Sequence, residues 1–370
     1  MNEDERKGKM SASKLGSYQL CPGKWQAEKG LPNTESEAAR NGTLFHKAMA
    51  GEIQVEKLSD DLKELFTLCW DQYSEIASNI GFLGFLAQPV DRVLVEQRLW
   101  CKSAGPEREW SGGIDRIEMI GDTALITDWK SGRIAQGTAS SSVQLRAYAV
   151  LAKENHPELQ KIYVALIQPL AGAPTVAGYD AFDLDAAREQ VDEIIDAAMQ
   201  PGAQRVPSPD ACRYCAAKGV CPEARAEAEA VVAFEPPALV GLSDEQLGLF
   251  LERAEVAEDV IAEAKAEAKR RLLAGQKIPG LALQKGKASR SIRDVQEAFQ
   301  RLSGSLSAEQ FVAACKVSVT QLEGALCGAL DIKKKEAKDK LGELLGDVLE
   351  TKIGEPAMVR KQAETKGEIE

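Results

Sequence analysis

The sequence is poor in aromatic side chains, in histidine and in long apolar runs. Aromatic residues make up 5% of the 370 residues, and only 2 are histidines. No apolar run approaches the roughly 20 residues that a membrane-spanning helix needs. Residues 1–10 are charged and lack the apolar core of a signal peptide. We therefore expect a soluble cytoplasmic protein that does not associate with a membrane.

The chain also lacks an excess of basic residues. Its formal net charge is −11, from 46 basic and 57 acidic residues, which argues against broad, non-specific coating of nucleic acid but is compatible with a local basic groove. Residues 265–293 are a local exception, because Glu267 is their only acid among many lysines and arginines. This stretch is either a solvated helix face or a strip that contacts phosphates.

The most informative stretch is WSGGIDRIEMIGDTALITDWK, at residues 110–130. Two apolar-rich runs flank Gly121-Asp122, and a Gly-Asp pair between β-prone runs is typical of a tight two-residue turn. Side chains at alternating positions of a strand share a face. The stretch therefore predicts a β-hairpin with an apolar end near the turn and an ionic end away from it.

Pairing outward from the turn sets Ile117 opposite Ile126 and then Asp115 opposite Asp128. Like charges directly opposed across strands destabilise a sheet, so a positive partner is needed. Mg²⁺ prefers one or two carboxylates and keeps other positions for water and substrate phosphate. Lys130, on the same face, would stabilise the negative charge that develops in phosphodiester hydrolysis. The alternative is an ordinary surface hairpin with solvated charges.

Two more ionisable side chains could reach this hairpin. His46 lies in a helix predicted over residues 37–50, and a neutral imidazole can complete a hard-metal site made mostly of carboxylates. A packed or solvent-facing histidine is the alternative. Glu96 lies in a strand predicted over residues 90–100 and is considered only for a supporting position around the metal.

The chain beyond the hairpin predicts an α/β core. A helix over residues 143–152 is followed by the short apolar run 161–167, and strand, helix, strand in this order indicates a crossover with parallel strands. Gln144 and Tyr148 are four residues apart in this helix and share a face. They could touch the substrate backbone or brace Lys130, and an ordinary polar helix face is the alternative.

The 8 cysteines are informative through their spacing. Cys212, Cys215 and Cys221 form a C-x2-C-x5-C pattern, and Cys21, which precedes a proline at an expected helix end, is the best fourth ligand. Four thiolates bind Zn²⁺ or an iron–sulfur cluster. Such a site would clasp the N-terminal helix to the far end of the core, whereas reduced, buried thiols are the alternative.

The character of the chain changes in its C-terminal third. An Ala/Glu/Lys-rich helix is predicted from Leu242 to about Ala274. Further elements are expected as a strand at 281–285, helices at 295–302, 307–326 and 333–349, and a poorly ordered tail from about Gly354. We therefore divide the chain into residues 1–234 and a mainly helical C-terminal domain, residues 235–370, with a DNA-contacting or assembly role.

These motifs together resemble the PD-(D/E)XK nuclease superfamily, and more narrowly its RecB-like branch, which includes phage exonucleases and CRISPR adaptation nucleases. The resemblance covers residues 11–222 and is carried by His46, Gly112-Gly113-Ile114-Asp115, Asp128-Trp129-Lys130, Gln144 with Tyr148, and the four cysteines. It implies a restriction-endonuclease-like α/β core, with a central mixed sheet flanked by helices. The C-terminal part looks, more loosely, like phage-encoded proteins of the same superfamily.

The resemblance also implies a role for each motif residue. It implies that Mg²⁺ or Mn²⁺ is bound by His46, Asp115, Asp128 and the Trp129 main-chain carbonyl. It implies that Lys130 positions water and that Gln144 and Tyr148 contact DNA or the catalytic loop. It implies a [4Fe–4S] cluster, with Zn²⁺ as the alternative, on Cys21, Cys212, Cys215 and Cys221.

The activity implied by the resemblance is exonucleolytic cleavage of linear DNA by a phage or prophage protein. The single strands produced would be passed to an annealing protein that acts in recombination, and a homo-oligomer is left open. Two alternatives remain at this point: a structure-specific endonuclease, and a non-catalytic DNA-binding or assembly factor that retains the nuclease scaffold.

Overall fold

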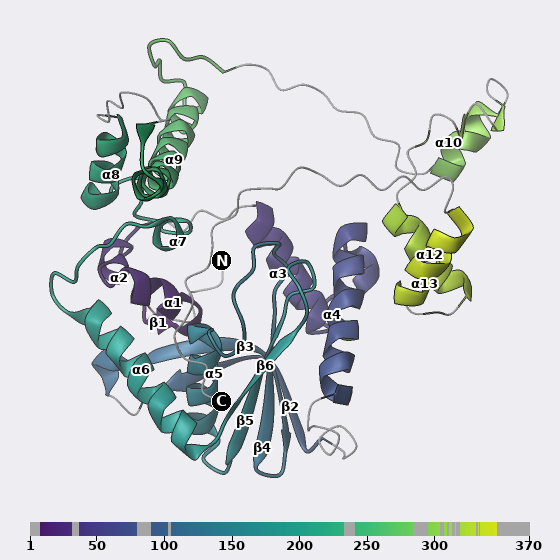
Figure 1. The fold of residues 1–370 in the computed structure, drawn as a ribbon, viewed down its shortest axis with the longest axis horizontal. Coiled ribbons are helices and arrows are strands. Elements are labelled where there is room, and N and C mark those ends of the chain that lie inside the picture. Colours follow the sequence, from purple (N-terminus) through teal and green to yellow (C-terminus); the bar gives the residue numbers. More distant parts are fainter. Residues whose placement is uncertain are drawn as a thin grey trace. The chain divides into compact units, whose positions relative to one another are not determined.

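The predicted hairpin is at the centre of the sheet in the computed structural model (Figure 1). Strands β3 (Trp110–Ile120) and β4 (Thr123–Trp129) pair antiparallel, with Ile117 opposite Ile126. Gly121 in the turn has a φ of 57°, a left-handed conformation that glycine adopts without a steric penalty. The predicted register is therefore confirmed from Ile120 opposite Thr123 to Arg116 opposite Thr127, whereas the predicted Asp115–Asp128 pair is not formed.

The structure describes most of the first 283 residues and less of the chain beyond them. The described residues are 8–31, 37–79, 90–102, 105–232, 241–283, 295–303, 307–308, 311–312, 315, 319–330, 332 and 334–345. The chain divides into two compact units, Met1–Leu283 and Gln284–Glu370.

The first unit contains a 6-stranded mixed sheet. Its remaining strands are β1 (Met10–Ser11), β2 (Arg92–Cys101), β5 (Lys161–Ile167) and β6 (Thr175–Tyr179). The strand order is β1-β3-β4-β5-β6, and β2 pairs with β3. β4 and β5 are parallel, as the predicted crossover requires, whereas β5 and β6 are antiparallel.

Helices cover both faces of this sheet, and each face has its own apolar core. One core receives side chains from α1 (Ala12–Leu20), α5 (Val143–Asn155) and α6 (Ala181–Met199). The opposite core receives them from α3 (Glu37–Met49) and α4 (Asp60–Asn79). Figure 1 shows α6 and α4 on opposite sides of the sheet. The predicted α/β class, with a central mixed sheet flanked by helices, is confirmed.

The first compact unit continues past residue 234, where the sequence suggests a boundary. It also contains α2 (Lys24–Ala27), α7 (Pro209–Cys212), α8 (Pro222–Val232) and α9 (Asp244–Leu273). Cys212 of α7, Ala224 of α8 and Val256 of α9 share a small apolar core. This packing attaches the long helix to the first unit, and no periodicity within α9 could have indicated it.

The C-terminal part is mainly helical, as predicted. Its described helices are α10 (Val295–Leu302), α12 (Val319–Leu330) and α13 (Lys334–Leu345). The single helix predicted over residues 307–326 is wrong, because the chain bends at Cys315. None of the helices in the described ranges has the length and apolar character needed to cross a membrane.

The strand predicted at residues 281–285 is absent from residues 281–283, the part of it that the structure describes. Residues 281–283 carry only an isolated bridge between Ile278 and Leu281. The intervening Pro279-Gly280 turns the chain, with Gly280 at a φ of 77°, so the bridge closes a tight loop instead of starting a strand. Residues 284–285 and the tail from Gly354 lie outside the described residues.

Gly112 provides a test of how closely α5 rests on β3. A Cβ at this position would lie 2.8 Å from Leu151 Cδ1 and 2.8 Å from Tyr148 Cε1, whereas packed carbon atoms sit roughly 3.5–4.0 Å apart. We expect Gly112→Ala to lower the free energy of unfolding by about 1–3 kcal/mol, measured by urea denaturation. Gly113→Ala is the matched control, because its Cβ would meet only the Arg98 guanidinium, at 3.5 Å from Nη2 and 4.0 Å from Cζ. Equal losses in both variants would contradict this packing.

Candidate active site

Three potential metal ligands converge at one end of the sheet. His46 of α3, Glu96 of β2 and Asp115 of β3 bring their ligating atoms within 4.8 Å of one another. His46 Nδ1 lies 3.3 Å from Asp115 Oδ1 and 3.6 Å from Glu96 Oε1. Within the part of the chain that the structure describes, no other three histidine, cysteine or acidic side chains come this close. The structure thus brings predicted His46 and Asp115 together and adds Glu96.

Glu96 is the residue whose role sequence reasoning underestimated. Its φ of 48° makes it the only non-glycine residue with a positive φ among the described residues. Such a backbone conformation costs of order 1–3 kcal/mol and persists mainly where the surroundings enforce it, often at functional sites. The only sequence signal is the polar triplet Glu96-Gln97-Arg98, which interrupts the apolar alternation of the strand.

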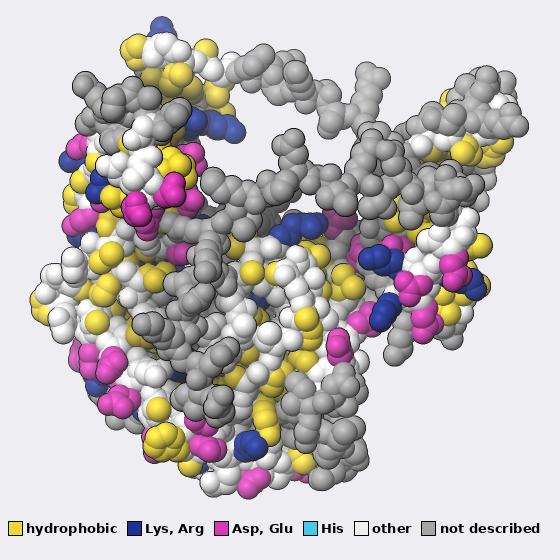
Figure 2. All heavy atoms as spheres, in the orientation of Figure 1, with side chains coloured by type: hydrophobic (Ala, Val, Ile, Leu, Met, Phe, Trp, Pro, Cys, Tyr) yellow, Lys and Arg dark blue, Asp and Glu magenta, His cyan; other side chains and the backbone are white. Residues whose placement is uncertain are grey.

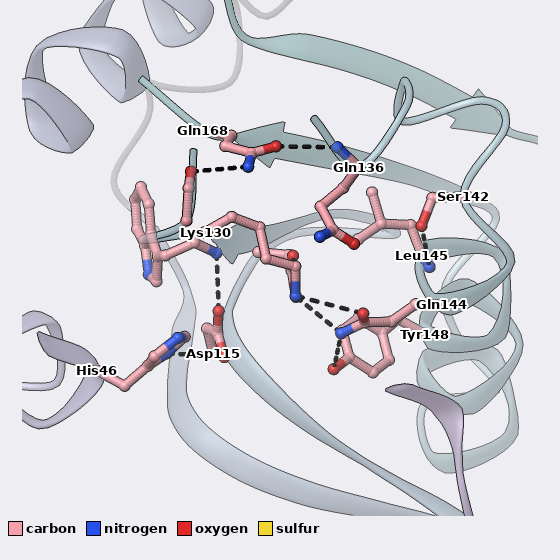
Figure 3. A network of polar contacts seen from close by, with 12 residues as sticks. His46, Asp115, Lys130, Gln136, Ser142, Gln144, Leu145, Tyr148 and Gln168 are labelled. Carbon is pink, nitrogen blue, oxygen red and sulfur yellow. Dashed lines mark hydrogen bonds and ion pairs between the residues drawn. The ribbon is translucent and has the colours of Figure 1, made fainter. Parts of the chain in front are cut away.

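The distortion at Glu96 extends across to β3. Glu96 and Asp115 are missing from the otherwise continuous pairing of β2 with β3. Ile114 and Ile117 pack into the same core, although strict alternation would place them on opposite faces. Alternation is therefore interrupted at Asp115. Its Oδ2 accepts the Trp129 N–H at 2.8 Å, while Oδ1 faces His46 (Figure 3).

Asp128 and Lys130 form a mostly buried ion pair near this group. Lys130 Nζ lies 2.9 Å from Asp128 Oδ2 and 3.1 Å from Oδ1. Gln144 joins both, since its Nε2 donates to Asp128 Oδ1 at 3.0 Å and its Oε1 accepts from Lys130 at 3.3 Å. Asp128 Oδ2 is buried and is paired with the Lys130 ammonium, although it accepts no well-aligned hydrogen bond from a described residue.

Tyr148 completes this network from α5. Its hydroxyl donates to the Gly113 carbonyl at 2.6 Å and receives a hydrogen bond from Gln144 Nε2 at 2.6 Å. The side chain is 2% exposed. Of the two roles considered for Gln144 and Tyr148, the structure therefore has them in the bracing one, because their polar atoms are used to hold the Asp128–Lys130 pair.

Trp129 turns its side chain away from this network. The indole packs against Trp70 and Tyr73 of α4, with ring centroids 5.5 and 5.9 Å apart. The main-chain N–H of Trp129 donates to Asp115 Oδ2. The Trp129 main-chain carbonyl stays a predicted metal ligand.

Neighbouring carboxylates raise the pKa values of the two basic side chains at this site, His46 and Lys130. Burial lowers the pKa of His46, but hydrogen bonding and charge attraction from Asp115 and Glu96 outweigh it and raise the pKa to about 10. Burial raises the pKa of Asp128 to about 6, with the Asp115 charge adding to the effect and Lys130 opposing it. For Lys130, burial is outweighed by the charges of Asp128 and Asp115, so its pKa is raised and it stays an ammonium at neutral pH.

The donor set fits a hard divalent cation. Carboxylate oxygens are the preferred ligands of Mg²⁺, and imidazole is accepted by Mn²⁺. The buried Asp128 carboxylate lies nearby, and a cation that bound it would share it with Lys130. The sequence predicts His46, Asp115 and Asp128 as metal ligands. In the structure His46 and Asp115 lie together with Glu96, whereas Asp128 lies outside this group.

The four motif cysteines lie in one region but do not form a compact ligand group. Cys21 Sγ accepts the Val206 N–H at 3.2 Å. Burial raises the pKa of Cys212, and the neighbouring Cys215, Cys21 and Cys221 thiols add to the shift. No three of these sulfurs approach within 4.8 Å, whereas tetrahedral Zn²⁺ holds its sulfurs about 3.8 Å apart. A ready-made zinc site is therefore absent among these described cysteines.

The basic stretch at residues 265–293 is described only to residue 283. In that part, Glu267 binds Arg270 and Arg271 at 2.6 and 2.7 Å, which offsets some of its positive charge. In Figure 2 the visible basic side chains lie in separate small groups interspersed with acidic ones. The described part therefore carries less net positive charge at Arg270 and Arg271 than the sequence alone suggests.

Comparison with known proteins gives a family but no described activity. The family model described as "Protein of unknown function (DUF2800)" matches residues 8–366. No curated protein matches the chain in sequence. The solved structure titled "Crystal structure of SSO0001" aligns with a TM-score of 0.31 at 16% identity, covering 60% of this chain and 88% of that chain.

The raised pKa of His46 predicts how the metal-free protein responds to pH. Because the pKa rises from 6.5 to about 10 on folding, the protonated imidazole stabilises the fold fully below about pH 6.5, and this contribution is lost as pH rises through about 10. We expect the free energy of unfolding in EDTA to fall from about pH 7 to about pH 10 more steeply for wild type than for His46→Gln. Urea denaturation across this range measures it, and parallel curves would contradict the assignment.

Proposed function

We propose that this chain, which belongs to the family described as "Protein of unknown function (DUF2800)", is a metal-dependent deoxyribonuclease that degrades linear DNA as an exonuclease. The observation that carries the proposal is the convergence of His46, Glu96 and Asp115 beside the buried Asp128–Lys130 pair. Acidic ligands next to a fixed ammonium suit the hydrolysis of a phosphodiester, whose transition state gathers negative charge.

The residues at this site divide between holding a cation and serving the reaction. His46, Glu96 and Asp115 would hold Mg²⁺ or Mn²⁺, and Asp128 would add negative charge beside it while keeping its ion pair with Lys130. A cation bound there supplies Lewis-acid polarisation of the phosphoryl oxygen and a water of lowered pKa. Binding displaces the proton from His46, so metal affinity falls as the pH is lowered.

Lys130 serves the reaction as a fixed positive charge. Its pKa is raised by Asp128 and Asp115 against the effect of burial, so it acts as a hydrogen-bond donor and not as a general base. It can orient the attacking water or neutralise a phosphate oxygen. Gln144 and Tyr148 are positioning residues, because they hold the Asp128–Lys130 pair from α5.

Two alternatives make different demands on the same residues. A structure-specific endonuclease would use the same metal centre but would cut closed circular DNA. A non-catalytic DNA-binding or assembly factor would not need every ionisable residue of the motifs, whereas the sequence contains all of them. An annealing partner and a phage setting stay predictions that derive from the sequence resemblance.

The central test compares cleavage of linear and closed circular DNA with and without Mg²⁺. We expect wild type to release nucleotides from linear DNA only with the metal, and Asp128→Ala or Lys130→Ala to reduce the rate by about 100-fold or more. Lys161→Ala is the matched control, because Lys161 is an exposed lysine at the start of β5. Undiminished cleavage by either site variant would refute the assignment, and cutting of closed circles would identify an endonuclease.

The role of Glu96 is separable within the same assay. We expect Glu96→Gln to raise the Mg²⁺ concentration needed for half-maximal cleavage by about tenfold, the loss typical of a weakened metal contact. Gln97→Ala, a substitution at the neighbouring residue, is the control. An unaltered Mg²⁺ requirement in Glu96→Gln would exclude Glu96 as a ligand.

We propose further that the four cysteines bind a [4Fe–4S] cluster, with Zn²⁺ as the alternative. A [4Fe–4S] cluster is held by four thiolates, the number that these cysteines provide. Lys24 supports a negatively charged group here, since it is 3% exposed, its Nζ donates to the Ala211 carbonyl at 2.9 Å, and no described carboxylate pairs with it. The Lys24 charge lowers the pKa of Cys215, against the larger effect of burial.

Colour and metal content test this second proposal. Protein purified without oxygen should be brown, with broad absorbance at about 400 nm, and should contain iron and sulfide. We expect Cys212→Ser to lose the absorbance and Cys315→Ser, at an exposed cysteine of the C-terminal part, to keep it. Colourless protein that carries zinc would reject the cluster.

A further inference from the structure

The segment between β4 and α5 is exposed and irregular, yet it is held at several points. Residues 131–142 contain neither helix nor strand. Connections of about 12 residues without secondary structure are uncommon in compact domains and are frequently functional. This segment begins directly after Lys130 and ends at Ser142, the N-cap of the helix that carries Gln144 and Tyr148. It therefore borders the candidate active site at both of its ends.

Gln168 is the main anchor of this segment. Its side chain is 6% exposed and lies just beyond the end of β5. Nε2 donates to the Gly132 carbonyl at 2.9 Å and to the Ile134 carbonyl at 2.7 Å, while Oε1 accepts the Gln136 N–H at 3.1 Å (Figure 3). One buried amide thus satisfies three backbone groups that no regular structure would satisfy.

A second anchor lies further along the segment. Thr175 Oγ1, at the start of β6, accepts the Ala139 N–H at 2.8 Å. At the near end, the Lys130 N–H donates to the Ile167 carbonyl at 2.9 Å. The segment is therefore fixed to β5 and β6, and its backbone is ordered before any substrate arrives, which reduces the entropic cost of binding.

The outer side of the segment suits a phosphate backbone. Residues 131–142 contain no acid, although the chain has 57. Arg133 is exposed and forms no ion pair with a described residue. The backbone N–H groups of residues 132–135 likewise find no acceptor within the described ranges. Arginine side chains and free backbone N–H groups are among the common donors to phosphate oxygens.

We propose that residues 131–136 form a preorganised phosphate-binding strip that guides a DNA strand to the metal centre, with Arg133 as its charged contact and Gln168 as its positioning residue. This proposal rests on the proposed nuclease function. Arg133 is three residues from Lys130, at most about 11 Å along the chain, so the strip would hold the strand next to the phosphate that is cut.

The test measures DNA binding in EDTA, where binding is separated from cleavage. Anisotropy of a fluorescein-labelled linear duplex is followed against salt concentration. We expect Arg133→Gln to weaken binding about tenfold, the loss of one hydrogen bond to a charged group, and to lower the slope of log K against log salt by about 0.9. Arg92→Gln, at an exposed arginine near the apolar end of the hairpin, should leave the slope unchanged.

The role of Gln168 is tested by its coupling to Arg133. Gln168→Met keeps the side-chain volume but removes all three hydrogen bonds. We expect it to lower the salt slope in the wild-type background and to leave the slope unchanged in an Arg133→Gln background, because its effect on that slope passes through the arginine. If Gln168→Met does not fold, Thr175→Val removes the second anchor and is measured in the same way.

The outcomes separate this proposal from the proposed function. If Arg133→Gln binds DNA with the affinity and the salt slope of wild type, the strip is overturned. It is also overturned if the salt slope falls in each single variant and the two decreases add in the double variant. Wild type that binds DNA but never cleaves it, with the expected coupling present, would support the strip and refute the nuclease. Wild type that binds no DNA would overturn both.

Discussion

The carboxylate of Asp115 joins three elements of the candidate site, because its two oxygens have different partners. Oδ2 accepts the Trp129 N–H at 2.8 Å, and Oδ1 faces His46 at 3.3 Å. One side chain of β3 thereby links β4 to α3. In a regular hairpin the same residue would simply oppose Asp128, so the geometry of the site depends on the irregular backbone at Glu96 and Asp115.

Concentrated negative charge is the cost of this arrangement. At an effective dielectric constant of about 20, two like charges roughly 4 Å apart repel by about 4 kcal/mol. In the metal-free protein, a proton on His46 offsets Asp115 and Glu96, while the Lys130 ammonium offsets Asp128. A divalent cation would take over the first of these tasks. Metal binding is therefore expected to be coupled to release of the proton from the imidazole.

Rigid support for the reactive groups comes from α5 and from β5. The Tyr148 hydroxyl holds the Gly113 carbonyl, next to Gly112, where α5 approaches β3 so closely that a Cβ would clash. On the other side, Gln168 at the end of β5 fixes the segment that follows Lys130. Packing that stabilises the fold and hydrogen bonds that position Asp128 and Lys130 thus share the same elements.

Local patterns in the sequence were sufficient for the hairpin, its register from the turn to Arg116 opposite Thr127, and the parallel crossover, because turn chemistry and side-chain alternation act over a few residues. Only the tertiary structure decided the place of Glu96, the bracing role of Gln144 and Tyr148, and the anchoring of residues 131–136 by Gln168. Each of these depends on contacts between segments distant in the chain, such as the 36-residue separation between Gln168 and Gly132. The left-handed backbone at Glu96 and the buried Gln168 amide leave no periodic signal in the sequence, because the contacts that stabilise them form only when distant segments fold together.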